Sequence, residues 1–251
     1  MHHWKFPFVW TPLPTTCLVS VLFSHLFIWN LLNVAAKNEC IKLDLSIIQK
    51  IENLGFHRNL NWFVEAQTLD DKKWLNASCH TALKFNTGRA LFVNPDQIDD
   101  LMRQEKLNVF IDGPVDVEAA AHQAKGNTIY IYLNSTAISK GISVKLPIHL
   151  RYQRSLMGGN GKVILTKPEF LVYCTDTSYK ICGENQKVLA PPSVEDFQKI
   201  WAWKKLSYKA HFEETDLLVP VGNLDDYGYV AIITCILGCA GCIYILSVMS
   251  Y

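Results

Sequence analysis

The charged residues of this chain are confined to its middle, and this feature limits most strongly how the chain can fold. Of 24 Lys plus Arg and 23 Asp plus Glu residues, all except Lys5 lie between Lys37 and Asp226. The middle is therefore balanced in charge, and both ends are almost free of charge. A balanced region lacks the basic surface that binds nucleic acid or an anionic membrane surface. We therefore expect no nucleic-acid partner.

The N-terminal end has the pattern of a signal peptide. A weakly basic start that includes Lys5 is followed by the apolar run 18–32 and by the small residues of 34–36, where cleavage would occur. An uncleaved signal anchor is the alternative, but the apolar run is short for a membrane-spanning helix. We therefore expect residues 1–36 to be a signal peptide and residues 37–226 to be a lumenal domain.

The C-terminal end has the pattern of a membrane anchor. The uncharged segment 229–249 has about 20 residues, which is enough to span a bilayer, and Tyr227 and Tyr251 lie where interfacial aromatic residues are found. A removable GPI-attachment signal is the alternative. Against it, Asp225 precedes the segment where small residues and a polar spacer would be needed. We expect a transmembrane helix over 227–250 in a single-pass type I protein.

The middle region has the pattern of β-structure, because short runs of β-branched and aromatic residues are separated by turn signals. The expected strands are 60–66, 107–111, 128–133, 142–152, 162–165, 170–174 and 217–221. Asn94 before Pro95 predicts the start of one helix, and Ser193 after two prolines predicts another over 193–201. Short strands with minor helices favour an all-β, antiparallel sandwich.

Four cysteines lie in the expected lumenal domain, namely Cys40, Cys79, Cys174 and Cys182. An even number in an oxidising compartment implies two disulfides, in one of three pairings. Closeness in the sequence favours Cys174 with Cys182, which leaves Cys40 with Cys79. A zinc site is not expected, because no CxxC or neighbouring His supplies the spacing of a tetrahedral site.

Two triplets match the sequence required for N-glycosylation. They are Asn76-Ala77-Ser78 and Asn134-Ser135-Thr136. Such triplets also arise by chance, so their weight comes from the signal peptide. We expect glycans at Asn76 and Asn134.

No motif of catalysis is present. The stretch 158–162 resembles a phosphate-binding loop, but the first glycine of that motif would fall on Leu156, and Val163 replaces its Ser or Thr. There is no nucleophile elbow, no zinc-protease motif and no Asp-x-Asp pair of the kind that lumenal sugar transferases use. We therefore expect no catalytic, cofactor-binding or metal-binding residues, and no enzyme.

One polar cluster stands out at the end of the expected strand 142–152. Strand alternation places His149, Arg151 and Gln153 on one face. The cluster is either a solvated strand end or a binding edge at which arginine pairs with a carboxylate or phosphate. We name His149, Arg151 and Arg154 as candidate partner contacts.

An ordered series of segments resembles the PIG-X family, the accessory subunit of GPI mannosyltransferase I. The most specific of these is Leu-Pro-Ile-His-Leu-Arg-Tyr-Gln-Arg, residues 146–154. The complete series, which covers almost the whole expected mature chain, is 55–60, 88–101, 146–154, 168–174, 180–182 and 218–222.

The resemblance implies a non-catalytic protein of the endoplasmic reticulum membrane that stabilises a catalytic partner, PIG-M. That partner adds the first mannose in GPI-anchor biosynthesis, so the sugar chemistry belongs to the complex. The rival interpretation is a cell-surface adhesion or receptor ectodomain, anchored by its own helix or by GPI. The location of the full-length protein and the type of its glycans distinguish the two.

Small residues recur along the expected membrane helix. Four of them recur at near-helical spacing, namely Ala231, Cys235, Gly238 and Cys242, and Gly241 lies beside them. Small residues let membrane helices approach closely, so Gly238 and Gly241 are candidate contacts with the partner. Alternatively the helix is only an anchor, in which small residues are common and cysteines are filler or acylation sites.

Overall fold

The computed structural model describes residues 40–250, apart from 184–185 and 213–214. The expected signal peptide lies outside the described residues. The strands are β1 (Leu43–Glu52), β2 (His57–Leu69), β3 (Cys79–Asn86), β4 (Leu91–Phe92), β5 (Val109–Asp112), β6 (Thr128–Leu133), β7 (Ile142–Leu150), β8 (Asn160–Ile164), β9 (Glu169–Cys174), β10 (Lys187–Ala190), β11 (Trp201–Leu206), β12 (Lys209–Phe212) and β13 (Asp216–Pro220). The helices are α2 (Asp71–Asn76), α3 (Pro95–Arg103), α4 (Tyr227–Met249) and the short 3-10 turns η1 (Ser135–Lys140), η2 (Met157–Gly159) and η3 (Leu224–Asp226).

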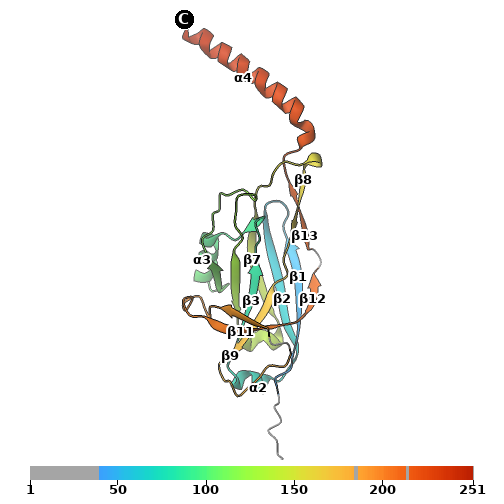
Figure 1. Ribbon diagram of the computed structural model, residues 1–251, viewed down its shortest axis with the longest axis vertical. Helices are drawn as coiled ribbons and strands as arrows, with labels where there is room; N and C mark the ends of the chain where they lie inside the picture. The colour runs from blue at the N-terminus through green and yellow to red at the C-terminus, as the bar shows by residue number, and fades with distance from the viewer. Residues whose placement is uncertain (1–39, 184–185, 213–214, 251) are drawn as a thin grey trace, which may run out of the picture. The chain divides into compact units, whose positions relative to one another are not determined.

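The strands form two packed sheets and a separate two-stranded ribbon (Figure 1). One sheet has five strands in the order β12-β1-β2-β7-β4, and the other has six in the order β10-β11-β9-β3-β6-β5. Every strand pair within these sheets is antiparallel except β1 with β12. The expected all-β sandwich with minor helices is therefore confirmed, with one parallel pair added at an edge.

The inner faces of the two sheets enclose one hydrophobic core, because alternate residues of each strand point inward. Trp62 of β2 packs edge-to-face on Phe85 of β3, with ring centroids 5.3 Å apart, which joins the two sheets. The indole Nε1 of Trp62 donates to Oε1 of buried Gln49 at 2.8 Å. The indole N–H of Trp62 and the side-chain carbonyl of Gln49 are therefore hydrogen-bonded to each other within the core.

The ribbon of β8 and β13 also has an inner face and an outer face. Val163, Leu217 and Val219 are buried against the core, while Ile164 and Leu218 are exposed. Buried Arg58 at the start of β2 fastens this ribbon to the five-stranded sheet. Its Nη2 donates to the Leu218 carbonyl at 2.6 Å, and its Nε donates to the Gly55 carbonyl at 3.0 Å.

All seven predicted strands are present, with boundaries shifted by a few residues. The helix predicted after Asn94 is confirmed as α3, and the Asn94 side chain accepts from the Asp96 N–H at 3.0 Å. The strands β1, β3, β4, β10, β11 and β12 were not predicted.

The helix predicted over 193–201 is wrong. The cap itself forms, because Ser193 Oγ accepts from the Asp196 N–H at 3.1 Å. The following residues make turns, and Trp201 begins β11. Side-chain burial on the sheet therefore outweighs the local helix signal.

The helix α4 is apolar around its whole circumference and exposed along its whole length. It is long and apolar enough to cross a membrane. A surface of this kind is stable in lipid rather than in water. The chain therefore fits a single-pass membrane protein.

Candidate functional site

The disulfides join Cys40 to Cys182 and Cys79 to Cys174. The pairing predicted from closeness in sequence, Cys174 with Cys182 and Cys40 with Cys79, is therefore wrong. Cys79 and Cys174 are direct neighbours across β3 and β9, and the residues next to Cys40 and Cys182 form a bridge of their own. Strand pairing, and not spacing along the chain, decides which cysteines meet.

The two glycosylation triplets meet at one end of the sandwich. Asn76 is exposed at the end of α2, and exposed Asn134 caps η1 by accepting from the Thr136 N–H at 3.1 Å. The indole of Trp74 in α2 donates to the Ser135 carbonyl at 2.9 Å, which holds the two triplets together. Glycans at both positions would therefore leave from the same end, and glycosylation itself stays a prediction.

His149 is half-buried on the five-stranded sheet. Its Nε2 lies 2.9 Å from Gln97 Oε1, and its ring stacks on Phe92 with centroids 5.1 Å apart. The ring of His57 approaches it edge-on at 4.4 Å. Burial, and secondarily the charge of His57, lower the pKa of His149, so the neutral imidazole is favoured.

Arg151 is buried and has an internal role. Its Nη1 donates to the carbonyls of Asp116 at 2.6 Å and Ala119 at 2.9 Å, and its guanidinium lies 4.5 Å from the centroid of Phe92. Burial lowers the pKa of this guanidinium, an effect that the charge of Asp116 opposes. The side chain therefore holds the 113–124 loop against the sheet and is already used within the fold.

The predicted alternation of this cluster holds beyond the last residue of β7. His149 and Arg151 both contact the ring of Phe92, which places them on the same face, and the Arg151 N–H donates to the Ala90 carbonyl at 2.8 Å. The 113–124 loop covers Arg151, whereas Arg154 is exposed and Gln153 is half-buried. Of the three candidate contacts in this cluster, Arg154 has the exposed side chain.

The six-stranded sheet has an aromatic outer face that the sequence did not predict. Trp203 is fully buried there and donates from Nε1 to the Ala190 carbonyl at 3.2 Å, while the Tyr132 hydroxyl donates to the Pro191 carbonyl at 3.1 Å. The segment 190–200 thus covers part of this face and encloses a second, smaller cluster. Aromatic residues at alternate positions, as in Trp201-Ala-Trp203, are the signal that a strand assignment would have used.

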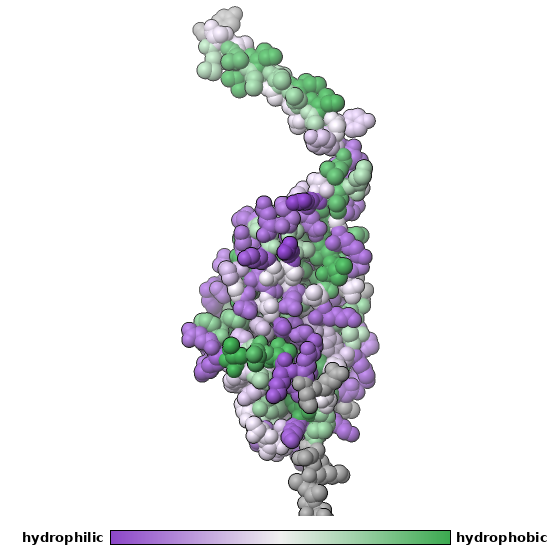
Figure 2. All heavy atoms as spheres, viewed as in Figure 1, coloured by the Kyte–Doolittle hydropathy of each residue, from purple (hydrophilic) through white to green (hydrophobic). Residues whose placement is uncertain are grey.

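Part of the aromatic outer face stays accessible. Trp201 and Tyr173 are half-buried with ring centroids 4.2 Å apart, and exposed His80 approaches Trp201 edge-on at 5.5 Å. Figure 2 shows green areas near β11 and again near β13. The exposed large hydrophobic residues near these strands include Leu189, Phe197, Ile200, Ile164 and Leu218. These residues form the apolar surface available to a partner.

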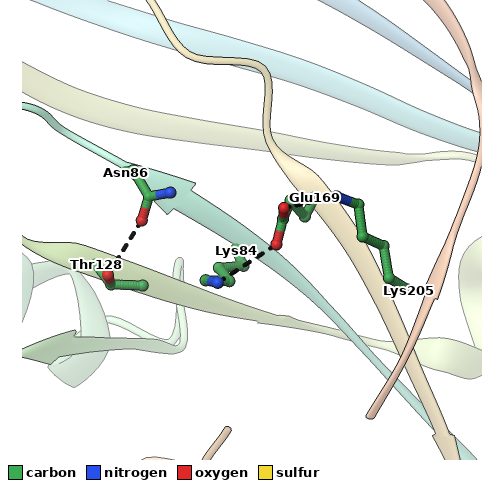
Figure 3. A network of polar contacts seen from close by, with 5 residues as sticks. All are labelled: Lys84, Asn86, Thr128, Glu169 and Lys205. Atoms are coloured by element: carbon green, nitrogen blue, oxygen red, sulfur yellow. Dashed lines mark hydrogen bonds and ion pairs between the residues drawn. The ribbon is translucent and has the colours of Figure 1, made fainter. Parts of the chain in front are cut away.

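A network of charges lies on the same outer face (Figure 3). Lys84 and Lys205 approach Glu169 from the strands on either side, at 3.4 Å and 2.7 Å. Burial of Glu169 raises the pKa of its carboxyl, but the hydrogen bond from Lys205 and the charges of both lysines outweigh it, so the pKa is lowered. The single carboxylate is therefore ionised between two cations, which is the arrangement of a cross-strand ion pair and not of a general acid.

An open hollow of about 640 Å³ lies between the end of α3, β6 and the start of β7. Its lining includes Glu105, Lys106 and Glu195 but no histidine or cysteine. Among the described residues, no group of three or more His, Cys, Asp or Glu side chains is placed to hold a metal ion. We find no arrangement in this hollow that resembles an acid–base pair or an activated nucleophile.

Gly238 and Gly241 lie in α4 with open space beside them, because a Cβ added at either position would meet no atom within 4 Å. The free cysteines Cys235, Cys239 and Cys242 are exposed on the same helix. Nothing within the described residues covers this part of α4. Its small residues are therefore accessible to another membrane helix.

Comparison with known proteins relates most of this chain to one family. Residues 53–250 match the family model described as PIG-X / PBN1. The relatives include the "GPI alpha-1,4-mannosyltransferase I, stabilizing subunit" of Homo sapiens, 26% identical over 185 residues that make up 71% of this chain and 69% of the relative. The proteins of the same name from Mus musculus and Rattus norvegicus are 27% and 26% identical over 67% of this chain, covering 66% and 67% of their own lengths. No solved structure matches.

Proposed function

This chain belongs to the PIG-X / PBN1 family, and from that premise we propose that it is the stabilising subunit of GPI mannosyltransferase I. The observation that carries the proposal is the match over 53–250, which includes the β domain from β2 onward and α4. The relatives are named as the stabilising subunit and not the catalytic one, in agreement with the prediction that this chain is no enzyme. The partner is then a PIG-M-like catalytic subunit that adds the first mannose to the GPI precursor.

We place the protein in the endoplasmic reticulum membrane, with residues 37–226 on the lumenal side. Two disulfides support a lumenal β domain, because they persist in oxidising compartments. In cells, the Asn76→Gln and Asn134→Gln variants should each lose one glycan, and endoglycosidase H should remove the remaining one. Glycans resistant to that enzyme on a surface-located protein would instead support the adhesion or receptor interpretation.

Stabilisation has a simple physical basis. A subunit that binds only the folded form of its partner lowers the free energy of that form, by about 2.7 kcal/mol when its concentration is 100 times Kd. A multi-spanning enzyme with an uncovered helix face is protected in this way from unfolding and degradation.

The test of the role is depletion. Loss of this protein should lower the amount of the catalytic subunit and the amount of GPI-anchored protein at the cell surface. Overexpression of the catalytic subunit should then restore part of the activity, because mass action replaces the lost stabilisation. Transfer of mannose by this purified protein alone would contradict the proposal.

We assign part of the partner contact to α4, at Gly238 and Gly241. Gly238→Ile and Gly241→Ile keep the segment apolar but prevent close approach of a second helix. Each should reduce co-purification of the catalytic subunit, whereas the control Ile236→Phe should not. If all three variants bind equally, α4 is an anchor and the contact is lumenal.

On the lumenal side we assign a contact to Arg154, because the side chains of His149 and Arg151 already have partners within the fold. Arg154→Glu reverses an exposed charge and should weaken association if an acidic group of the partner pairs with it. Lys125→Glu makes the same change at another exposed position and serves as the control. Equal association of the two variants would remove Arg154 from the contact.

A further inference from the structure

The turn η2 is fastened to the segment that leads into α4. The Leu156 N–H donates to the Gly222 carbonyl at 3.0 Å, and the Leu224 N–H donates back to the Leu156 carbonyl at 3.2 Å. The Gly158 N–H donates to Oδ2 of Asp225 at 3.0 Å. These three bonds connect η2 to η3, the last element before α4. The two segments therefore move as one unit.

The shape of η2 depends on two glycines. Gly158 and Gly159 have φ angles of 78° and 68°, in the left-handed region that favours glycine. The Gly159 carbonyl accepts from the Val221 N–H at 2.9 Å, which closes the turn against the end of β13. The turn thereby places Met157 at its tip, where the side chain is 77% exposed.

Apolar side chains gather on this unit. Leu156 is 44% exposed and Leu224 is 46% exposed, and both neighbour the exposed tip at Met157. The segment 155–161 contains no charged residue. At the start of α4, Tyr227 and Tyr229 are also exposed, as aromatic residues are at a membrane interface. These apolar side chains therefore lie close to the start of α4, beside the exposed carboxylates of Asp225 and Asp226 in η3.

The length of η3 fixes how far this surface lies from the membrane helix. η3 has three residues, and at about 2.0 Å per residue it spans about 6 Å. The interfacial layer on each side of a bilayer is about 5–7 Å thick, from the difference between a total of about 40–45 Å and a hydrocarbon core of about 30 Å. A backbone bonded to Leu224 therefore falls within the interfacial layer when α4 enters the hydrocarbon core near Tyr227.

We propose that η2 is a second membrane contact, in which Leu156, Met157 and Leu224 lie in the interfacial layer of the bilayer that α4 spans. The proposal rests on the assignment of α4 as the membrane anchor. Because the turn itself carries no positive charge, the contact is apolar and does not depend on anionic lipid. Two points of attachment restrict rotation of the β domain about α4, which a single helix would leave free. The lumenal contact surface is then presented to the catalytic subunit in one orientation.

The experiment measures depth in the bilayer with a spin label on the full-length chain in liposomes of zwitterionic lipid. The background variant carries Cys235→Ala, Cys239→Ala and Cys242→Ala, and both disulfides are left intact. Into it we introduce Met157→Cys, or Ile200→Cys as an exposed apolar control at the start of β11. A chain that retains Cys239 alone of the three α4 cysteines supplies the reference within α4. For each spin label we measure the rate of collision with oxygen, which concentrates in lipid, and the rate of collision with a water-soluble nickel chelate. The ratio of the two rates reports the depth of the label in the bilayer.

We expect the oxygen-to-nickel collision ratio at position 157 to be several-fold higher than at position 200 and lower than at Cys239. Leu224→Cys, read in the same way, should match position 157, because the backbones of Leu224 and Leu156 are hydrogen-bonded. A ratio at both 157 and 224 equal to that at 200 overturns the second contact while leaving α4 as the anchor. A low ratio at Cys239 itself overturns the anchor, and the second contact with it. A ratio that rises only when anionic lipid is added overturns the apolar nature of the contact.

Discussion

The two ends of the β domain are held together by different means. At the end that carries α2, which we call the distal end, Cys79–Cys174 and Cys40–Cys182 fasten the strands covalently. At the end from which the chain leaves for α4, which we call the exit end, η2, η3, β8 and β13 are joined by hydrogen bonds and glycine turns. Figure 1 shows α2 and the start of α4 at opposite ends of the strands. The two disulfides therefore lie at the end of the β domain that is farther from α4.

The difference has consequences for stability. The disulfides span 142 and 95 residues of sequence, so each removes much freedom from the unfolded chain. A single hydrogen bond contributes only about 0.5–1.5 kcal/mol. We therefore expect the distal end to depend on a few covalent bonds and the exit end to depend on many small contributions.

Removal of a disulfide should have the largest effect. The double variants Cys79→Ser/Cys174→Ser and Cys40→Ser/Cys182→Ser should each lower the free energy of unfolding by about 2–5 kcal/mol. Denaturant unfolding of the purified full chain measures this. Peptide mapping of the unreduced wild type provides the control, and a peptide that links Cys174 to Cys182 would contradict the pairing.

Loss of the arginine at the exit end should have the next largest effect. Arg58→Met keeps most of the volume but removes the bonds to the Leu218 and Gly55 carbonyls. Because the donor is charged and buried, we expect a loss of about 2 kcal/mol in the free energy of unfolding. Arg154→Met, at an exposed position, should change it by less than about 0.5 kcal/mol. Equal effects of the two would mean that the ribbon is held by packing alone.

The glycine turn offers a finer comparison within the exit end. Gly158→Ala forces a left-handed conformation on alanine, at about 1–2 kcal/mol, in otherwise open space. Gly159→Ala should cost more, because its added Cβ would lie 3.3 Å from the Asn223 Cβ. Thermal unfolding of the two variants measures the order. The reverse order would show that the turn is free to move away from η3.

The smallest expected effect concerns pH. The pKa of His149 is lowered from 6.5 on folding, by burial and then by His57, so just below pH 6.5 the unfolded chain binds more protons than the folded one. Stability is therefore lost as the pH falls through this window, until the folded pKa is passed. His149→Gln should reduce the fall in melting temperature between pH 7.5 and 5.5. His122→Gln, at an exposed histidine, should leave the fall unchanged, and a fall unchanged in both variants would contradict the role of His149.

Local patterns predicted much of the fold. The uncharged C-terminal segment, the cap at Asn94 and seven strands all follow from side-chain periodicity and turn chemistry, which act over a few residues. The unpredicted strands have another origin. Trp201-Ala-Trp203 follows a helix-start signal at Ser193, and the edge strand β12 pairs with β1, which lies far from it in the sequence.

The candidate site was predicted less completely, because a partner contact requires an exposed side chain and exposure is not a local property. His149 and Arg151 belong to the same polar run as Arg154, yet only the last is exposed, because Phe92 and Gln97 cover His149 and the 113–124 loop covers Arg151. The aromatic outer face around Trp203 is assembled from side chains of several strands, so the sequence of any one strand does not predict it.

By itself the sequence determined the class of this protein: a balanced β domain, a charge-free helix at its end, four cysteines in two disulfides, and an ordered resemblance to one family. Each of these depends on composition or on spacing within a short window. Only the tertiary structure decided which cysteines pair, which polar side chains face inward, and that η2 lies against η3. Those outcomes depend on strand register, which brings together residues as far apart in the sequence as Ser46 and Lys209.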